Sequence, residues 1–348
     1  MGTRRRRVSV IYFISKLVKW DDLCMEIISN PTQVDIEKAA KALIDGHLVA
    51  FPTETVYGLG ADATNEKAVS RIYSIKGRPE NHPLIVHISS INQLENWVRD
   101  IPEYAIKLGN IFWPGPMTLV LKRSTLAMDF ITGRQDSIGI RVPDQQAAQL
   151  LTQEFEKLGG SGIAAPSANR FGSVSPTTAQ AVEEELGKFL GNEDLILDDG
   201  QCEIGVESSI IDCTQANPVV LRPGAITSEM IEKVTGLKTL LKSAKSEIRV
   251  SGLLESHYAP NATVILSAAT KPGDGFIALS DVVTPIGAIR LASPASIEDY
   301  ARDLYKALRL GDQYGLNKIS VVVPEGAGLA VAIRDRLGKA ASGKLAKN

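Results

Sequence analysis

The stretch that decides the fold reads Phe51-Pro52-Thr53-Glu54-Thr55-Val56-Tyr57-Gly58-Leu59-Gly60. It begins at the end of an apolar run, residues 47–51, which predicts a buried strand that Pro52 ends. The threonines that follow therefore lie just beyond a strand end, the region that lines ligand crevices in open α/β sheets. Threonines in turns also commonly bond to their own backbone, so this segment by itself leaves a ligand site and a simple turn both open.

Two cations and a histidine come next. Lys76 and Arg78 follow a predicted helix over residues 65–75 and lead into a proline-punctuated loop. Both cations can converge on one anion, because Arg offers a planar fork for phosphate and Lys a mobile point charge. A solvated basic helix end is the alternative. His87 lies near the end of the next apolar strand, residues 84–88, where a lone histidine is more often a satisfied core side chain than a catalyst.

Further polar groups follow later strands. Ser167-Ala168-Asn169 come after a glycine-rich and then an apolar run. Small residues let a backbone approach a ligand closely, and Ser and Asn offer neutral donors and acceptors for phosphate, ribose or adenine. A turn after a buried strand explains them equally well. Arg141 and Arg222 each lie in an apolar strand, where a long cation needs an anionic partner, either an internal carboxylate or a substrate.

The composition is that of an ordinary globular protein: 348 residues, 44% of them hydrophobic and 22% charged. The net charge of −2 gives no strong overall field toward nucleic acid. Cys24, Cys202 and Cys213 lack metal-site spacing, suit a reducing compartment and are interpreted as small buried side chains. The apolar run at residues 8–14 is too short to span a bilayer, so we expect a cytoplasmic protein without a membrane anchor.

The length predicts more than one domain. Mixed helix and strand patterns over residues 32–237 predict an α/β catalytic domain with a twisted, mixed sheet. Residues 1–31 are predicted to be an N-terminal extension, with residues 1–24 interpreted as an upstream addition and an organelle address as the alternative. Residues 238–261 are polar and predict a linker. Residues 262–348 predict a smaller, Rossmann-like domain with a parallel sheet.

The sequence contains no P-loop, no glycine-rich dinucleotide fingerprint, no HExxH zinc motif and no GxSxG elbow. The groups gathered in its motifs are cations and hydroxyls. Such a set favours electrostatic positioning of charged substrates over covalent catalysis.

Taken in order, these motifs resemble the YrdC-like threonylcarbamoyl-AMP synthase family. The matching patterns are Pro-Thr-Glu-Thr-x-Tyr-Gly-Leu, Lys-x-Arg-Pro, Ser-x-Asn and Arg-Pro-Gly. The linker ending His257-Tyr258-Ala259-Pro260 is similar to the long form of the family, which adds a Rossmann-like C-terminal domain. The resemblance implies a YrdC-like fold and a nucleotidyltransferase that joins L-threonine, bicarbonate or CO2, and ATP into threonylcarbamoyl-AMP and pyrophosphate.

The resemblance also implies partners. The product feeds the modification of the adenosine next to the anticodon of certain tRNAs, through a tRNA threonylcarbamoyl transferase complex; direct tRNA binding is left open. Mg²⁺ is expected on the triphosphate of ATP. Because the sequence shows no acidic ligand cluster, we expect phosphates and water to hold this metal.

Individual residue roles follow from the same resemblance. Lys76 and Arg78 are the expected catalytic pair on the phosphates, and Tyr258 is expected to fold over the site as a lid. His82 stands where the family usually has Asn, and no residue stands out as a general base. Contacts to L-threonine are expected from Thr55, His87, Arg141 and Ser208, with Arg141 on the carboxylate. Contacts to ATP are expected from Arg78, His82, Ser137, Ala165, Ser167, Asn169, Ser175, Arg222 and Tyr258.

Two other functions are alternatives at this point. One is an RNA-binding or ribosome-assembly module with a basic groove; the slightly acidic balance and the lack of an aromatic stacking platform or a basic C-terminal tail argue against it. The other is a carbamoyl-transfer domain that acts on another adenylate, as in hydrogenase-maturation relatives, but their zinc-finger and acylphosphatase-like parts are missing from this sequence.

Overall fold

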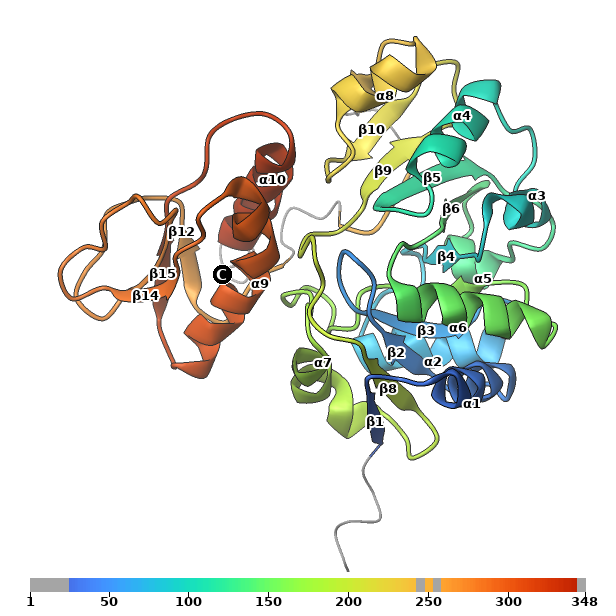
Figure 1. The fold of residues 1–348 in the computed structure, drawn as a ribbon, viewed down its shortest axis with the longest axis horizontal. Coiled ribbons are helices and arrows are strands. Elements are labelled where there is room, and N and C mark those ends of the chain that lie inside the picture. Colours follow the sequence, from blue (N-terminus) through green and yellow to red (C-terminus); the bar gives the residue numbers. More distant parts are fainter. Residues whose placement is uncertain (1–24, 242–247, 253–257, 343–348) are drawn as a thin grey trace, which may run out of the picture.

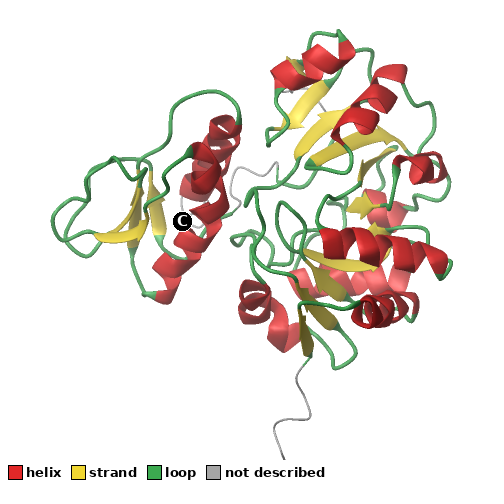
Figure 2. Cartoon of the chain, in the orientation of Figure 1, coloured by secondary structure: helices red, strands yellow, loops and turns green. Residues whose placement is uncertain are grey.

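The computed structural model describes residues 25–241, 248–252 and 258–342. These residues build an 11-stranded sheet and a separate 4-stranded sheet, each with helices packed against it (Figures 1 and 2). The expectations for residues 1–24, Cys24 and His257 lie outside the described residues. Within them, no helix has the length and apolar character needed to cross a bilayer.

The large sheet combines parallel and antiparallel neighbours, which confirms the predicted mixed sheet. Its spatial order is β1-β8-β2-β3-β7-β4-β6-β5-β9-β10-β11. β4 and β6 are parallel, for example, whereas β2 and β3 are antiparallel. The strands are β1 (Glu26–Ser29), β2 (Val49–Phe51), β3 (Gly58–Asp62), β4 (Ile85–His87), β5 (Met117–Lys122), β6 (Ser137–Arg141), β7 (Ile163–Ala164), β8 (Leu195–Asp198), β9 (Ser209–Asp212), β10 (Val219–Arg222) and β11 (Leu240–Leu241).

Helices cover this sheet, and their ends position site residues. α2 begins after Asn65, whose side chain accepts hydrogen bonds from the N–H groups of Lys67 and Ala68. It ends at Gly77, which has a φ of +61° and takes the left-handed conformation that glycine adopts readily. Lys76 and Arg78 therefore flank a sharp change of chain direction. The helices of this domain are α1 (Gln33–Ile44), α2 (Glu66–Lys76), α3 (Leu94–Trp97), α4 (Glu103–Phe112), α5 (Asp129–Thr132), α6 (Gln146–Lys157), α7 (Ala179–Leu186) and α8 (Ser228–Thr235), with 3-10 helices η2 (Ile91–Gln93) and η3 (Gly187–Phe189).

The C-terminal domain has the predicted parallel sheet. Its four strands lie in the order β12-β15-β13-β14, and all neighbours are parallel. Its helices lie on the side of the sheet that faces the first domain (Figure 1). The elements are β12 (Thr263–Ile265), β13 (Gly275–Ile277), β14 (Ile289–Ala292), α9 (Ile297–Gln313), β15 (Lys318–Val321) and α10 (Leu329–Ser342).

Several strands of the large sheet depart from the sequence-based expectation. Leu195–Asp198 form β8, and Leu240–Leu241, at the start of the predicted linker, form β11. Glu26–Ser29, placed in the N-terminal extension, form β1 and pair in parallel with β8. Gly58–Asp62 form β3, although glycine disfavours strands. The reason is close packing: a Cβ on Gly60 would lie 2.8 Å from Phe51 Cε1 and 2.9 Å from Ile163 Cγ2.

The two domains share an apolar cluster. Val56, Val174 and Val206 of the first domain pack in the same cluster as Tyr305 of α9 and Ile333 of α10. All five side chains are buried. The contact between the domains is therefore part of the hydrophobic core.

Candidate functional site

One pocket lies in the first domain and gathers most of the predicted site residues. Two backbone pairings bring its walls together: Leu59 N–H donates to Pro166 O at 2.8 Å, and Ala168 N–H donates to Tyr57 O at 2.8 Å. The Pro-Thr-Glu-Thr segment and the Ser-x-Asn segment therefore lie side by side. The predicted residues that line the pocket are Thr55, Arg78, His87, Arg141, Ala165, Ser167, Ser208, Arg222 and Tyr258.

Parallel strands place His87 next to Arg141. β4 ends at His87 and β6 at Arg141, and the two residues are register partners in this parallel pair. The ends of parallel neighbours meet at one edge of a sheet, where ligands bind in α/β folds. Burial, with a smaller contribution from Arg141, lowers the pKa of His87 to about 3. The imidazole is therefore neutral at neutral pH.

Arg141 has an internal carboxylate partner. Its Nη2 lies 2.7 Å from Glu54 Oε1, and both side chains are almost fully buried. The two atoms are in contact but not aligned for a hydrogen bond, and Nε and Nη2 of Arg141 make none to the described part of the chain. His87 Nδ1 is likewise without a hydrogen bond there. Buried donors of this kind call for a partner, and a planar carboxylate fits a guanidinium best.

Arg78 and Arg222 converge on the linker residue Ser251. Arg78 Nη2 donates to Ser251 Oγ at 3.1 Å, and Arg222 Nη1 donates to Ser251 O at 3.1 Å. Burial lowers the pKa of Arg78 to about 10, which leaves it protonated at neutral pH. Two guanidinium groups from distant segments thus share one small polar residue, an arrangement that phosphate oxygens can also satisfy.

Hydroxyl groups complete the walls of the pocket. Thr53 and Thr55 lie with their Oγ1 atoms 2.8 Å apart, and Thr53 Oγ1 also donates to Val56 O at 2.7 Å. Thr53 thus makes the hydrogen bond to its own backbone that is expected of a threonine in a turn, and it also lines the pocket. Ser208 Oγ lies 2.8 Å from Thr118 Oγ1 and accepts from Arg222 Nη2 at 3.1 Å.

Lys76 lies behind the pocket wall and not on it. Its Nζ donates to Ser167 O at 2.5 Å and also to Asn169 O. Burial lowers the pKa of Lys76 well below its usual value, and the nearby Arg78 lowers it further. Asn169 is also buried, and its Nδ2 donates to Ser173 O at 2.8 Å. Both residues therefore fix the Ser-x-Asn turn from behind.

Three other predicted residues surround the pocket without lining it. The ring of His82 packs edge-to-face on Phe171 with centroids 5.3 Å apart, and burial lowers its pKa. Ser137 lines an adjoining pocket together with Ile85 and Ser251. Ser175 Oγ donates to Glu207 Oε1 at 2.6 Å.

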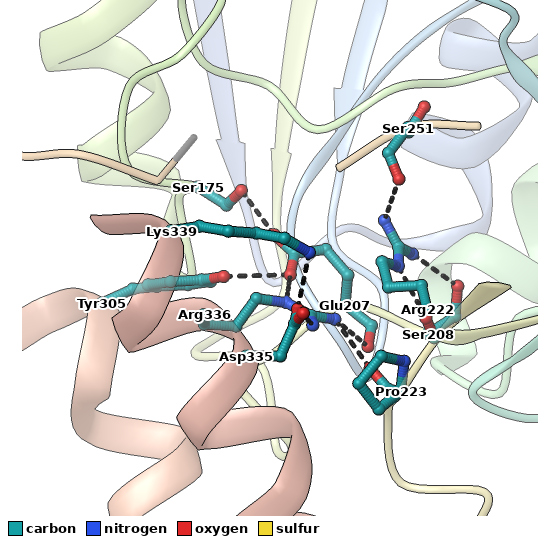
Figure 3. Close-up of polar contacts among 10 residues, drawn as sticks. All are labelled: Ser175, Glu207, Ser208, Arg222, Pro223, Ser251, Tyr305, Asp335, Arg336 and Lys339. Atoms are coloured by element: carbon teal, nitrogen blue, oxygen red, sulfur yellow. Dashed lines mark hydrogen bonds and ion pairs between the residues drawn. The ribbon is translucent and has the colours of Figure 1, made fainter. Parts of the chain in front are cut away.

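Glu207 is the principal pocket residue that sequence reasoning missed. Figure 3 shows its carboxylate between Ser175 of the first domain and Tyr305 and Arg336 of the second. Burial by itself would raise the pKa of Glu207, but Arg336 and Arg222 hold it at about 2. One signal was available: Arg336 follows Ile333 and precedes Leu337 and Ala340 on the apolar face of α10, where a charge requires a buried partner.

The donors that face the pocket are guanidinium and hydroxyl groups, which suit phosphate and carboxylate ligands. A metal ion bound by protein ligands would need a different set of side chains. In the described ranges, no cluster of three or more His, Cys, Asp or Glu side chains is arranged to hold a metal ion. Cys202 and Cys213 are buried free thiols, as the sequence predicts.

Both domains match known families. Residues 41–224 match the family model of Sua5, YciO and YrdC proteins, which carries the description telomere recombination. Residues 226–342 match the model of the threonylcarbamoyl-AMP synthase C-terminal domain. The two matches follow each other along the chain. The first covers most strands of the large sheet, and the second covers the whole 4-stranded sheet together with α8 and β11 of the first domain.

Named relatives and a solved structure agree with these matches. The threonylcarbamoyl-AMP synthase of Pyrococcus abyssi is 40% identical over 331 residues, which cover 90% of this chain and 95% of the relative. That of Bacillus subtilis is 38% identical, with 93% and 97% covered. The crystal structure of P. abyssi Sua5 complexed with L-threonine superposes with a TM-score of 0.82 at 37% identity, covering 92% of this chain and 98% of that one. The chain therefore belongs to the threonylcarbamoyl-AMP synthase family in its two-domain form.

Proposed function

We propose that this chain is a nucleotidyltransferase that joins L-threonine, bicarbonate or CO2, and ATP into threonylcarbamoyl-AMP and pyrophosphate. The observation that carries the proposal is the convergence of Arg78, Arg141 and Arg222 on one pocket. The threonine carboxylate, the carbamate formed from threonine and the triphosphate of ATP are all negatively charged, so their mutual repulsion is a central obstacle. Buried guanidinium groups offset this repulsion and hold the reactants in place.

Arg141 is the proposed partner of the threonine carboxylate. Its Nε and Nη2 are buried and make no hydrogen bond to the described residues, although Glu54 holds the guanidinium in place. Neutral His87 adds a polar group without adding charge, and Thr55 and Ser208 add hydroxyls. This set can recognise the carboxylate, the ammonium and the hydroxyl of threonine together.

Arg78 and Arg222 are the proposed phosphate partners of ATP. In this structure their donors are directed at Ser251, so ATP phosphates would take over bonds that the linker now makes. Ala165 and Ser167 line the same pocket. Tyr258 lines it from the linker and, as proposed, closes over the bound nucleotide.

The residues behind and beside the pocket have supporting roles in the proposal. Lys76 and Asn169 hold the turn that carries Ser167 and thereby act on the phosphate site. His82, Ser137 and Ser175 remain proposed ATP-site residues. Of these, Ser137 lies in the adjoining pocket with Ser251, which suits a contact to the base or ribose end of the nucleotide.

The reaction needs orientation more than a reactive side chain. The deprotonated amine of threonine attacks CO2 and releases a proton to water to form a carbamate, a carbamate oxygen attacks the α-phosphorus, and the bond to pyrophosphate breaks. Well-oriented reactions of this type gain roughly 7–11 kcal/mol from positioning. Mg²⁺ would neutralise charge on the triphosphate. Both carboxylate oxygens of Glu207 already accept hydrogen bonds, so phosphates and water would hold the metal.

The biological setting completes the proposal. The product would pass to a tRNA threonylcarbamoyl transferase complex in the cytoplasm. Purified protein tests the chemistry directly: pyrophosphate release from ATP should require both L-threonine and bicarbonate. ATP turnover that ignores either compound would refute the proposal, and salt-sensitive RNA retention without turnover would favour the RNA-binding alternative.

A further inference from the structure

A buried cluster joins the two domains at the pocket wall. It consists of Glu207 from the first domain and of Tyr305 and Arg336 from the second (Figure 3). Arg336 also pairs with Asp335 of its own helix, and Lys339 gives Asp335 a second cationic partner. Arg336 Nε donates to Glu207 Oε2 at 2.7 Å, and Tyr305 Oη donates to the same oxygen at 2.9 Å. The side chain of Arg336 is 0% exposed and that of Glu207 is 7% exposed. The contact is thus sealed from water on both sides.

Glu207 is the acidic member of a pocket otherwise lined by guanidinium, imidazole, hydroxyl and apolar groups. Without a counter-charge, its carboxylate would repel the phosphates of ATP and the carboxylate of threonine across a poorly screening interior. The first domain provides Ser175 as a neutral hydrogen-bond donor to this carboxylate. The cation in contact with it, Arg336, comes from the C-terminal domain.

Arg336 also fixes the backbone on both sides of the pocket wall. Its Nη2 donates to Pro223 O at 3.0 Å and to Glu207 O at 3.4 Å. Pro223 follows Arg222, and Glu207 precedes Ser208. One side chain from the second domain therefore holds the two segments that carry a proposed phosphate contact and a proposed threonine contact.

We propose that Arg336 is a positioning residue for the reaction: it neutralises Glu207 and aligns the segments that carry Ser208 and Arg222. The inference rests on the proposed function, because it concerns how this pocket tolerates anionic substrates. It gives the C-terminal domain a chemical task. That domain supplies the charge that completes a binding pocket located in the other domain.

Two variants test this inference, one that removes the positive charge of the contact between Arg336 and Glu207 and one that removes its negative charge. Binding of Mg·ATP is measured by calorimetry without threonine, so that no turnover is needed. Arg336→Met leaves Glu207 negative and should weaken ATP binding roughly ten- to hundredfold, the scale of one charge contact at an effective dielectric constant of about 20. Glu207→Gln keeps one carbonyl oxygen that can accept from both Tyr305 and Arg336, and it removes the negative charge while the Arg336 cation remains. It should tighten ATP binding roughly two- to tenfold.

The double variant separates charge from docking. If Arg336 acts through the charge of Glu207, Arg336→Met combined with Glu207→Gln should recover most of the ATP affinity that Arg336→Met loses. A purely structural role predicts weaker binding in both single variants and no recovery in the double one. Arg336→Lys should keep part of the affinity, because the charge remains and the fork is lost.

A second contact between the domains provides the matched control. Arg309 of α9 donates to Val174 O and lies 3.3 Å from Glu185 Oε2, and none of these three residues lines the pocket. Arg309→Met should leave ATP affinity within about twofold of wild type. Equal losses in Arg309→Met and Arg336→Met would overturn the inference.

The inference can still be tested if one of the variants does not fold. If Arg336→Met does not fold, Glu207→Gln alone decides, because tighter ATP binding supports the inference and weaker binding overturns it. The proposed function fails separately, if wild-type protein binds ATP but releases no pyrophosphate in response to threonine and bicarbonate.

Discussion

Replacing Lys76 with methionine tests whether this lysine acts as a clamp on the Ser-x-Asn turn. In the structure its Nζ donates to the carbonyl oxygens of Ser167 and Asn169, and the side chain is 2% exposed. Methionine has nearly the same volume, so packing is largely kept while both hydrogen bonds are lost. The change therefore isolates the polar contribution of the lysine.

The size of the effect follows from those two bonds. Hydrogen bonds to a charged group contribute about 1.5–3 kcal/mol each, and each carbonyl left unpaired in the interior adds a cost. Removal of a desolvated ammonium group offsets part of this loss. We expect the free energy of unfolding to fall by about 3 kcal/mol, and ATP-dependent turnover to fall roughly tenfold or more, because Ser167 lines the pocket.

Urea unfolding and pyrophosphate release measure the two effects on the same samples. Lys67→Met, on the exposed side of the same helix, is the control and should change neither. The pH adds a second readout. Because burial lowers the pKa of Lys76, the unfolded chain binds more protons between this lowered pKa and about pH 10.5, so wild-type stability should rise with pH over that window relative to Lys76→Met. Lost turnover at unchanged stability would refute the clamp and favour direct phosphate binding.

Three further predictions concern the pocket and its walls. Arg141→Met should raise the KM for threonine roughly ten- to hundredfold, the scale of a charge-assisted bidentate contact, while ATP affinity measured by calorimetry falls less than threefold; equal losses would contradict its assignment to the threonine carboxylate. Glu207 has a pKa of about 2 against the usual 4.5, so about 3 kcal/mol of stability should be present above pH 4.5 and disappear as the pH falls through 2. The cost of Glu207→Gln in urea unfolding should therefore shrink from pH 7 to pH 3, and a pH-independent cost would argue against the low pKa. Gly252→Ala should lower the free energy of unfolding by about 2 kcal/mol, because its φ is +81° and the new Cβ would lie 2.2 Å from Tyr258 Oη. The control Gly236→Ala has a φ of +69° but no neighbouring atom near the new Cβ, so it should lose only about 1 kcal/mol. Equal losses would show that the contact with Tyr258 is unimportant.

Periodic apolar patterns account for much of what the sequence predicted about the fold. The C-terminal strands and helices are regular in pattern, and the structure confirms both their order and their parallel pairing. β3 escaped prediction because its glycines are required by neighbours that are distant in sequence. β1 escaped because an edge strand as short as Glu26–Ser29 is specified by its partner β8 more than by its own residues.

The site residues likewise divide into those that the sequence pattern placed and those whose position depends on distant neighbours. Motif order was enough to bring Arg78, Arg141 and Arg222 to one pocket, since the ends of β6 and β10 place Arg141 and Arg222 and the end of α2 places Arg78. The contacts of Lys76 depend on which way its side chain turns, and spacing in a sequence does not report that. Glu207 was missed because its importance depends on Arg336, which is 129 residues away along the chain and in another domain.

The apolar cluster shared by Val56, Val174 and Val206 with α9 and α10 has a consequence for any attempt to take the molecule apart. Cleaving the polypeptide between residues 242 and 247 would break one covalent connection and leave this apolar contact between the domains intact. The two pieces would stay associated. A first domain expressed alone would expose the apolar side chains of these three valines to solvent. The two domains of this chain are therefore expected to unfold as one unit.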